Sequence, residues 1–373
     1  MDQATKPLIQ NEEVNYVDQI PIRNIWLLML YASDLYRDLD QSKKSVEDNP
    51  DDIPDLVAEI LYRRVEQRIR RNLNFGYIAR NDVLNRVRGR IDLFQTARQR
   101  LLDRGQVACH YNEFTVDTPR NRYVRDALRK MSTVVSSKSN LVNKCRSLAL
   151  TLERMGVIGE RPNHRTITVN QFGLHDANDR PMLQAAYLAF NLALPEEMIG
   201  TRVLSNPDRN SLWLRKLFEK SVAGFYDVKL SKKGWRVYPG ERCYWPVDLE
   251  SKTPQIDDIL PGMQTDIVLS NKKLKKRIII DTKFTSILKV GQFRKETLNS
   301  GYLYQIYAYL RTQEEQSELA RNATGLLLHP VVDGTVYEAV KIQNHEIRFA
   351  TVDLADSCVE IAKQLLNAVE VEF

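Results

Sequence analysis

The sequence lacks the features of a membrane-spanning, secreted or disulfide-linked protein. No run of 18 or more apolar residues occurs in the 373 residues, so a spanning helix of ordinary length is excluded. The first 19 residues are polar and acidic without an apolar segment, and we expect no secretory signal. The four cysteines lie far apart with no CxxC pair, which argues against a zinc ribbon or a disulfide framework. We therefore expect a cytoplasmic protein that makes no contact with a membrane.

Several catalytic motifs are missing as well. No glycine is followed directly by lysine, so the phosphate-binding loop GxxxxGK[ST] is absent and the chain is not itself a motor of that type. A GxSxG elbow and a Cys/His metal quartet are also absent, which leaves little support for a serine hydrolase or a zinc site. The five histidines are scattered, and we expect each to be structural or exposed: His110, His164, His175, His329 and His345.

The sequence contains enough apolar residues to form the cores of two folded domains. Hydrophobic residues make up 43% and charged residues 27%, which is typical of globular proteins. Helical spacing alternates with short strand-like segments, so we predict an α/β protein. A region rich in Gly, Pro, Asn and His, Gly156 to Asn178, suggests the boundary. We predict a mixed α+β domain at residues 1–175 and a second domain at residues 176–373.

Positive charge is concentrated in one segment. Between Arg63 and Arg104 there are twelve arginines, no lysine and four acidic residues, which gives +8. The whole chain carries 54 − 48 = +6, so the remainder sums to −2. A segment of this kind fits a nucleic acid or an acidic protein partner, and a solvated helix face rich in arginine is the third reading.

The stretch from Met263 to Phe284 predicts a hairpin that ends in charged residues. Two runs of β-branched apolar residues flank a lysine-rich turn. The second run is continuously apolar, as in a strand covered on both faces, and it leads into Asp281 and Lys283. These two residues share a side of the sheet because side chains alternate along a strand. Asp266 on the preceding strand could then approach Asp281.

Paired carboxylates of this kind predict a metal site. Two neighbouring carboxylates repel each other unless a cation neutralises them, and Mg²⁺ is held by one or two carboxylates together with phosphate oxygens and water. A nearby lysine can orient or deprotonate the attacking water and stabilise the charge of the transition state. We therefore expect Asp266 and Asp281 to bind Mg²⁺ and Lys283 to act beside them in phosphodiester hydrolysis.

Two helices next to these strands carry further candidates. Glu219 lies on the helix before the strands and could supply a third carboxylate, although a solvated helix glutamate is the alternative. In GYLYQIYAYL, Gln305 and Tyr309 are four residues apart and share one helix face. An amide among tyrosines needs hydrogen-bond partners if it is buried, so Gln305 joins the candidate catalytic residues.

The two aspartates, the lysine and the helix residues together resemble the motif of the PD-(D/E)xK nuclease superfamily. Gln305 and Tyr309 match the QxxxY element of that superfamily, and Thr265 stands where it usually has proline. Three N-terminal blocks are similar to the McrC subunit of McrBC-type modification-dependent restriction systems. These blocks are IPIRNIWLLMLYA (Ile20 to Ala32), RVRGRID (Arg86 to Asp92) and YNEFTVDTPRNRYVRDAL (Tyr111 to Leu128). The resemblance covers the chain from about Ile20 to the last predicted helix, and it implies a nuclease domain with a mixed central sheet flanked by helices.

The same resemblance implies partners. It predicts an Mg²⁺-dependent endonuclease that acts on double-stranded DNA containing modified cytosine, together with a hexameric McrB-like AAA+ GTPase that it stimulates. Two N-terminal blocks would then contact partner or DNA, through Arg86, Arg88, Arg90, Asp117, Asn121 and Arg122. The alternative is a non-catalytic adaptor that activates a partner NTPase and carries a degenerate nuclease domain.

Overall fold

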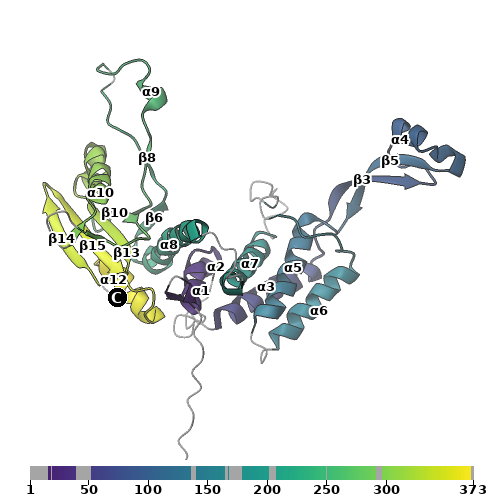
Figure 1. Cartoon of the computed structure of the whole chain (residues 1–373), viewed down its shortest axis with the longest axis horizontal. Coiled ribbons are helices and arrows are strands. Elements are labelled where there is room, and N and C mark those ends of the chain that lie inside the picture. Colours follow the sequence, from purple (N-terminus) through teal and green to yellow (C-terminus); the bar gives the residue numbers. More distant parts are fainter. Residues whose placement is uncertain are drawn as a thin grey trace, which may run out of the picture. The chain divides into compact units, whose positions relative to one another are not determined.

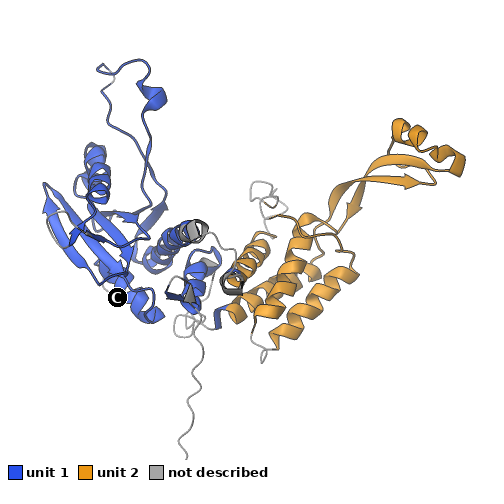
Figure 2. Cartoon of the chain, in the orientation of Figure 1, with its two compact units in different colours: residues 1–53, 194–373 blue, residues 54–193 orange. Residues whose placement is uncertain are grey.

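The computed structural model describes residues 16–17, 19–38, 52–135, 140–163, 167, 179–200, 207–248, 250–290 and 296–370. The chain forms two compact units that both mix helices and strands, so the α/β prediction is confirmed. Unit 1 comprises residues 1–53 and 194–373, and unit 2 comprises residues 54–193 (Figure 2). Most of the region in which we expected the boundary, including His164 and His175, lies outside the described residues.

Unit 2 combines a helical body with a projecting sheet. Its helices are α3 (Ile53–Arg70), α5 (Pro119–Val134), α6 (Leu141–Arg154) and most of α7 (Arg180–Gly200). Its antiparallel sheet has the order β3–β5–β4, formed by β3 (Gly76–Leu84), β5 (Val107–Thr115) and β4 (Arg90–Ile91). The helix α4 (Leu93–Arg98) and the short turn Leu101–Arg104 join β4 to β5. In Figure 1 the paired strands extend away from the helices of this unit, and we call residues 75–115 the arm.

Unit 1 is built on a six-stranded mixed sheet with the order β14–β15–β13–β10–β9–β6. The pairs β10–β13 and β13–β15 are parallel, and the other three pairs are antiparallel. The strands are β6 (Arg236–Pro239), β9 (Ile267–Asn271), β10 (Lys276–Thr282), β13 (Thr324–Pro330), β14 (Tyr337–Ile342) and β15 (His345–Val352). The short pairs are β1 (Tyr16–Val17) with β2 (Ile20–Pro21), β7 (Arg242–Cys243) with β8 (Met263–Gln264), and β11 (Leu288–Val290) with β12 (Glu296–Leu298).

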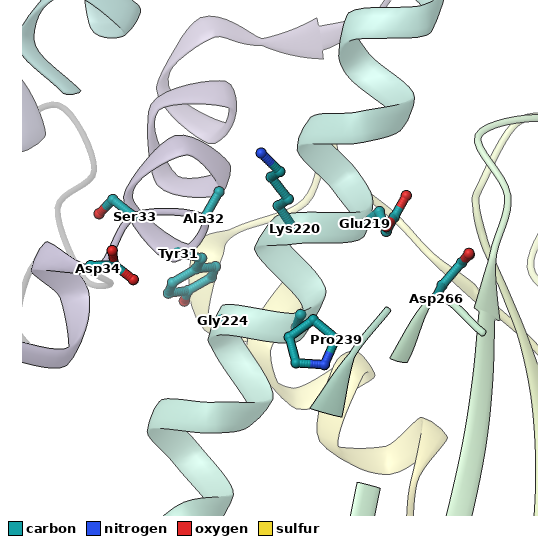
Figure 3. A pocket seen from close by; sticks show the side chains of 10 residues that line it. Tyr31, Ala32, Ser33, Asp34, Glu219, Lys220, Gly224, Pro239 and Asp266 are labelled. Atoms are coloured by element: carbon teal, nitrogen blue, oxygen red, sulfur yellow. The ribbon is translucent and has the colours of Figure 1, made fainter. Parts of the chain in front are cut away.

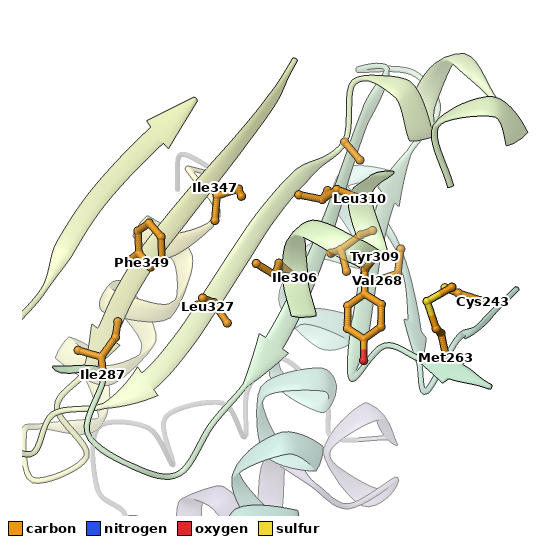
Figure 4. Packing of buried hydrophobic residues seen from close by; sticks show 12 residues of the cluster. Cys243, Met263, Val268, Ile287, Ile306, Tyr309, Leu310, Leu327, Ile347 and Phe349 are labelled. Atoms are coloured by element: carbon orange, nitrogen blue, oxygen red, sulfur yellow. The ribbon is translucent and has the colours of Figure 1, made fainter. Parts of the chain in front are cut away.

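Seven helices accompany this sheet in the described part of unit 1. They are α1 (Ile22–Tyr31), α2 (Leu35–Asp38), α8 (Pro207–Leu230), α9 (Ile256–Ile259), α10 (Ser300–Gln313), α11 (Glu318–Arg321) and α12 (Cys358–Ala368). On one sheet face, Val268, Ile279 and Leu327 from three adjacent strands pack against Ile306 and Leu310 of α10 (Figure 4). This apolar contact fixes α10 over the strands that carry the candidate site, and it excludes water from their centre.

The units differ from the expected domains at residues 1–53, which pack with the C-terminal part of the chain. Asn24 of α1 is buried, and its amide nitrogen donates to the main-chain oxygens of Leu354 (2.7 Å) and Asp356 (2.9 Å). A Cβ on Gly224 of α8 would lie 1.9 Å from the main-chain oxygen of Tyr31, so the two helices meet backbone to backbone. The apolar α1 therefore belongs to the core of unit 1, which the composition of the N-terminal half does not reveal.

Within the block from Ile20 to Ala32, only Ile22–Tyr31 form the helix α1. Pro21 stands at the N-terminal cap of α1, and α1 ends at Tyr31. There the main-chain N–H of Ser33 donates to Leu30 (3.0 Å), and its hydroxyl donates to the same oxygen (2.6 Å). These local bonds close the helix before α2 begins, as serine side chains commonly do at helix ends.

Candidate active site

The antiparallel pairing of β9 with β10 brings the two predicted aspartates together. Ile267 pairs with Ile280 at the end of this ladder. Extending that register by one residue sets Asp266 opposite Asp281, so the proximity of these carboxylates predicted from the hairpin is observed. Asp281 also pairs with Leu327 on the parallel neighbour β13, which covers its other side.

Asp281 is the most deeply buried acid of the site, with 1% of its surface exposed. Burial raises the pKa of Asp281 to about 6; Lys283 opposes that rise, and the charge of Asp266 adds to it. Lys283 Nζ lies 2.6 Å from Asp281 Oδ2 in an ion pair. The approach is not along a hydrogen-bond direction, and neither carboxylate oxygen of Asp281 accepts a well-directed hydrogen bond among the described residues. These oxygens are thus buried acceptors with capacity for a further ligand.

Lys283 is fixed by its surroundings rather than free in solvent. Only 6% of its surface is exposed, and its main-chain N–H donates to Leu328 of β13 (3.0 Å). Its ammonium lies 5.2 Å from the ring centroid of Tyr302, within the range of a cation–π contact. The aromatic face and the Asp281 carboxylate together stabilise a buried positive charge at the carboxyl end of β10.

Asp266 is held at one oxygen by the residue between Asp281 and Lys283. The main-chain N–H of Thr282 donates to Asp266 Oδ2 at 2.7 Å, and the Thr282 hydroxyl donates to the same atom at 2.8 Å. Asp266 is itself half-buried, whereas Thr282 is buried. Hydrogen bonds to the ionised form stabilise the carboxylate in this position.

Glu219 lies on α8, close enough to both aspartates to sense their charges. Burial raises the pKa of Glu219, and the negative charges of Asp266 and, more weakly, Asp281 raise it further. Figure 3 shows Glu219 and Asp266 at the edge of one pocket, of about 140 Å³, which Tyr31 and Lys220 also line. Three acidic side chains therefore interact electrostatically. No group of three or more His, Cys, Asp or Glu among the described residues is arranged to hold one metal ion, so any such ion would rest mainly on two carboxylates and water.

Gln305 and Tyr309 are linked to each other, as their spacing on the helix predicts. Gln305 Nε2 donates to Tyr309 Oη (2.8 Å), and Tyr309 Oη donates to the main-chain oxygen of Gln264 (2.9 Å). Gln264 lies two residues before Asp266. The pair thus connects α10 to the segment that carries the first aspartate, and neither side chain forms a described hydrogen bond to a carboxylate of the site.

The predicted arginines of the arm are exposed. Arg86, Arg88 and Arg90 lie in and after the turn that joins β3 to β4, and all three side chains face solvent. Arg88 stacks over the ring of Tyr111, with its guanidinium carbon 4.1 Å from the ring centroid. Apolar side chains are exposed on the same arm, namely Phe75, Tyr77, Val87, Leu93, Phe94, Leu102 and Phe114.

The other three predicted contact residues form hydrogen bonds within unit 2; Asp117 and Asn121 are buried, and Arg122 is partly exposed. Arg122 donates to both carboxylate oxygens of Asp117 (2.8 and 2.7 Å), and Asp117 also accepts from the main-chain N–H groups of Ile158 and Gly159. Asn121 donates to the main-chain oxygens of Asn74 and Val116. Asp117 and Asn121 have 4% and 2% of their surface exposed. In this conformation they connect elements of unit 2 and offer little surface to a partner.

Thr282 escaped the sequence analysis, and His329 lies near the site without having been linked to it. Thr282 occupies the variable position of the Asp-x-Lys pattern, where nothing in the sequence marks a role. His329 on β13 is fully buried, and its Nδ1 lies 2.8 Å from the main-chain oxygen of Thr285. Burial lowers the pKa of His329 to about 4, and its ring lies 5.7 Å from that of Tyr302. His345 is also buried and is held by Glu314, so both histidines have the structural environment expected of them.

None of the described helices is both long and apolar enough to cross a membrane.

Comparison with known proteins shows similarity to restriction system components. Residues 5–171 match the family described as McrBC 5-methylcytosine restriction system component. The chain is 25% identical over 349 residues to the type IV methyl-directed restriction enzyme EcoKMcrBC of Escherichia coli (strain K12), a match that spans 93% of this chain and 97% of the relative.

Two solved structures from Thermococcus gammatolerans show weak similarity to this chain. One is a half-complex of McrB AAA+ hexamers with bound McrC, from a tetradecameric assembly (TM-score 0.43, 12% identity, 94% of this chain and 75% of that chain). The other is the McrBC complex (TM-score 0.31, 11% identity, 50% and 60%). The sequence matches agree with the N-terminal blocks. Residues 5–171 of this chain carry a domain of the McrBC family of 5-methylcytosine restriction system components, and the chain as a whole is similar to the E. coli relative.

Proposed function

We propose that this protein is the endonuclease subunit of a modification-dependent restriction complex and hydrolyses DNA phosphodiester bonds with Mg²⁺. One observation carries the proposal: the β9–β10 register sets Asp266 opposite Asp281, with Lys283 two residues further along the same buried strand. This arrangement is the one expected of a PD-(D/E)xK nuclease, and the family and the E. coli relative are restriction components.

The donor set suits Mg²⁺. Asp281 presents two buried oxygens without well-directed hydrogen bonds, and Asp266 has both Thr282 bonds on a single oxygen. Hard oxygen ligands from one or two carboxylates, completed by water and substrate phosphate, are what Mg²⁺ takes in phosphoryl-transfer sites. Asp266 and Asp281 would hold the ion, which would polarise the phosphate and increase the acidity of a bound water. Glu219 is placed to contribute negative charge from α8.

The protein's own groups perform the remaining tasks. The ammonium of Lys283 is buried next to Asp281, where it can orient a water molecule and stabilise charge that develops on a phosphate oxygen. Gln305 acts through Tyr309, which fixes the main chain at Gln264. Gln305 is therefore a positioning residue in this proposal.

The partner in this proposal is an McrB-like AAA+ GTPase hexamer, and the substrate is double-stranded DNA containing modified cytosine. The exposed Arg86, Arg88 and Arg90, beside exposed apolar side chains of the arm, are the surface that we assign to the partner or to DNA. Arginine suits such contacts because its guanidinium binds carboxylates and phosphates in a bidentate manner. The internal network of Asp117, Asn121 and Arg122 would support the base of that arm.

A non-catalytic adaptor with a degenerate nuclease domain is the second candidate, because the arm offers a binding surface whether or not the site cuts DNA. The two candidates differ at Asp281. We expect Asp281→Ala to reduce Mg²⁺-dependent cleavage of methylated DNA by at least about 100-fold, since a bound metal contributes several kcal/mol to such reactions. Cleavage should be assayed with the partner and GTP present, and partner assembly measured in parallel.

The matched control is Asp258→Ala, which removes an exposed aspartate from α9 in the same unit. It should cut like the unmodified protein. Substantial Mg²⁺-dependent cutting by the Asp281→Ala protein would contradict the nuclease assignment and favour the adaptor.

A further inference from the structure

We propose that Thr282 is a positioning residue of the metal site: it anchors one oxygen of Asp266 so that the other oxygen stays directed to the metal. The inference rests on the proposed nuclease function and extends it to a residue outside the Asp, Asp and Lys pattern.

The first support is the way the strand ladder ends. The regular β9–β10 pairing stops at Ile267 and Ile280. Continued pairing would give the Thr282 N–H a main-chain acceptor on the β9 side. Instead, that N–H donates to Asp266 Oδ2, so a side-chain carboxylate replaces a backbone carbonyl at the end of the ladder. The main chain of Asp266 is held separately, because its oxygen accepts from the N–H of Gly240 at 2.8 Å.

The second support is that both bonds from Thr282 end on the same atom. Its N–H and its hydroxyl lie 2.7 and 2.8 Å from Oδ2, and neither uses Oδ1. A carboxylate that is free to rotate exchanges its two oxygens, whereas two donors on one oxygen fix its orientation. Hydrogen bonds to a charged acceptor are stronger than neutral ones, and Thr282 is only 2% exposed, so water competes little.

The third support is the side-chain chemistry of threonine at this position. Any residue except proline supplies the N–H bond, and a short hydroxyl side chain adds the second donor without adding charge. Threonine also has the β-branched shape that suits a buried strand. Valine would fill the same space and lose only the hydroxyl, which makes the proposal testable with little change in packing.

The test measures metal binding directly. Calorimetric titration of the whole chain with Mg²⁺, and with Ca²⁺ as a second probe, should show about tenfold weaker binding for Thr282→Val, the effect of losing one hydrogen bond to a charged group. Thr282→Ser should bind like the unmodified protein. In the complex with partner and GTP, the Mg²⁺ concentration that gives half-maximal cleavage should rise by a similar factor for Thr282→Val, with the maximal rate largely retained.

Controls separate positioning from a general effect on folding. Thr351→Val makes the same change on β15 of the same sheet, where the hydroxyl bonds only to main-chain atoms of Val336, and it should leave metal affinity unchanged. If Thr282→Val does not fold, the pair Thr282→Ser and Thr282→Ala isolates the hydroxyl instead. In an Asp266→Asn background, removing the Thr282 hydroxyl should have little further effect on binding.

Unchanged Mg²⁺ affinity in Thr282→Val or Thr282→Ala would overturn the inference, as would an equal loss of affinity in Thr351→Val. These outcomes are independent of the proposed function. That function fails if Asp281→Ala still cuts, whatever Thr282 does.

Discussion

At the scale of single residues, the candidate site contains a carboxylate whose ionisation destabilises the folded protein. Asp281 is buried beside a second carboxylate, and burial raises its pKa from 3.8 to about 6. An acid whose pKa is raised by folding destabilises the folded state when it ionises. The contribution of Asp281 is thus most favourable below pH 4, and stability is lost as the pH rises through 6.

We expect this cost to be visible in metal-free protein. A shift of about two pKa units corresponds to roughly 3 kcal/mol. In EDTA, the free energy of unfolding of Asp281→Asn minus that of the unmodified protein should therefore increase by up to about 3 kcal/mol between pH 4 and pH 7. Urea unfolding can be followed by tryptophan fluorescence, because Trp26, Trp213, Trp235 and Trp245 all belong to unit 1.

Added Mg²⁺ should reduce this difference at pH 7, since a cation on Asp281 compensates its charge. A difference that stays constant from pH 4 to pH 7 would show that Asp281 does not titrate in this range. Asp353→Asn, in the turn after β15 of the same unit, is the comparison for a loss of charge away from the site.

At the scale of helices and strands, much could be predicted because local patterns agree with tertiary burial. The β9–β10 hairpin lies where its two apolar runs predicted it, and Gln305 and Tyr309 lie on the helix α10 as their spacing predicted. The strands β14 and β15 were not predicted. β14 is exposed along nearly its whole length, and apolar and polar residues do not alternate along it, as is common in an edge strand. β15 does alternate, with His345, Ile347 and Phe349 buried, but a histidine and an arginine interrupt its apolar character.

The contact of α1 with α8 gives a prediction at this scale. Gly224→Ala would place a methyl group 1.9 Å from the main-chain oxygen of Tyr31, which cannot move without its helix. We expect a loss of about 3 kcal/mol or more from the free energy of unfolding of unit 1, because overpacking against backbone cannot be relieved by a side-chain rotation. Gly262→Ala, where nothing lies within 4 Å of the new methyl group, should be close to neutral.

Tryptophan fluorescence in urea would measure both variants. Equal stability of Gly224→Ala and Gly262→Ala would show that α1 does not pack on α8 as described.

At the scale of the whole molecule, the sequence brought the candidate residues together but did not divide the chain into its two units. Asp266, Asp281 and Lys283 are close in sequence, so strand pairing alone brings them together. The grouping of residues 1–53 with residues 194–373 depends on contacts such as that of Asn24 with Leu354, which no local pattern encodes. Similarly, Asp117, Asn121 and Arg122 form hydrogen bonds within unit 2. Composition alone cannot distinguish such an internal network from a binding surface.

Separate units predict separable activities. Replacing Arg86, Arg88 and Arg90 together by alanine should reduce stimulation of the partner's GTP hydrolysis by about tenfold, if each exposed arginine contributes about 0.5 kcal/mol. Asp281→Ala should retain stimulation. The control triple, Arg63, Arg64 and Arg71 to alanine, removes the same charge from exposed positions on α3 and in the turn directly after it, and should have a smaller effect.

An equal loss in both triple variants would indicate that net charge, rather than the arm, drives the interaction. Loss of stimulation in Asp281→Ala at normal assembly would contradict the division of labour between the two units.

The placement of α1 has a consequence for biosynthesis. Asn24 bonds to Leu354 and Asp356, so its partners leave the ribosome more than 300 residues after it does. During that interval the core of unit 1, in which α1 is buried, is incomplete. Unit 2 is continuous in sequence, so it can fold on its own as it emerges. Unit 1 therefore closes only near the end of translation. A ribosome that stalls early would release a chain with a folded arm, an exposed apolar helix and an incomplete candidate site.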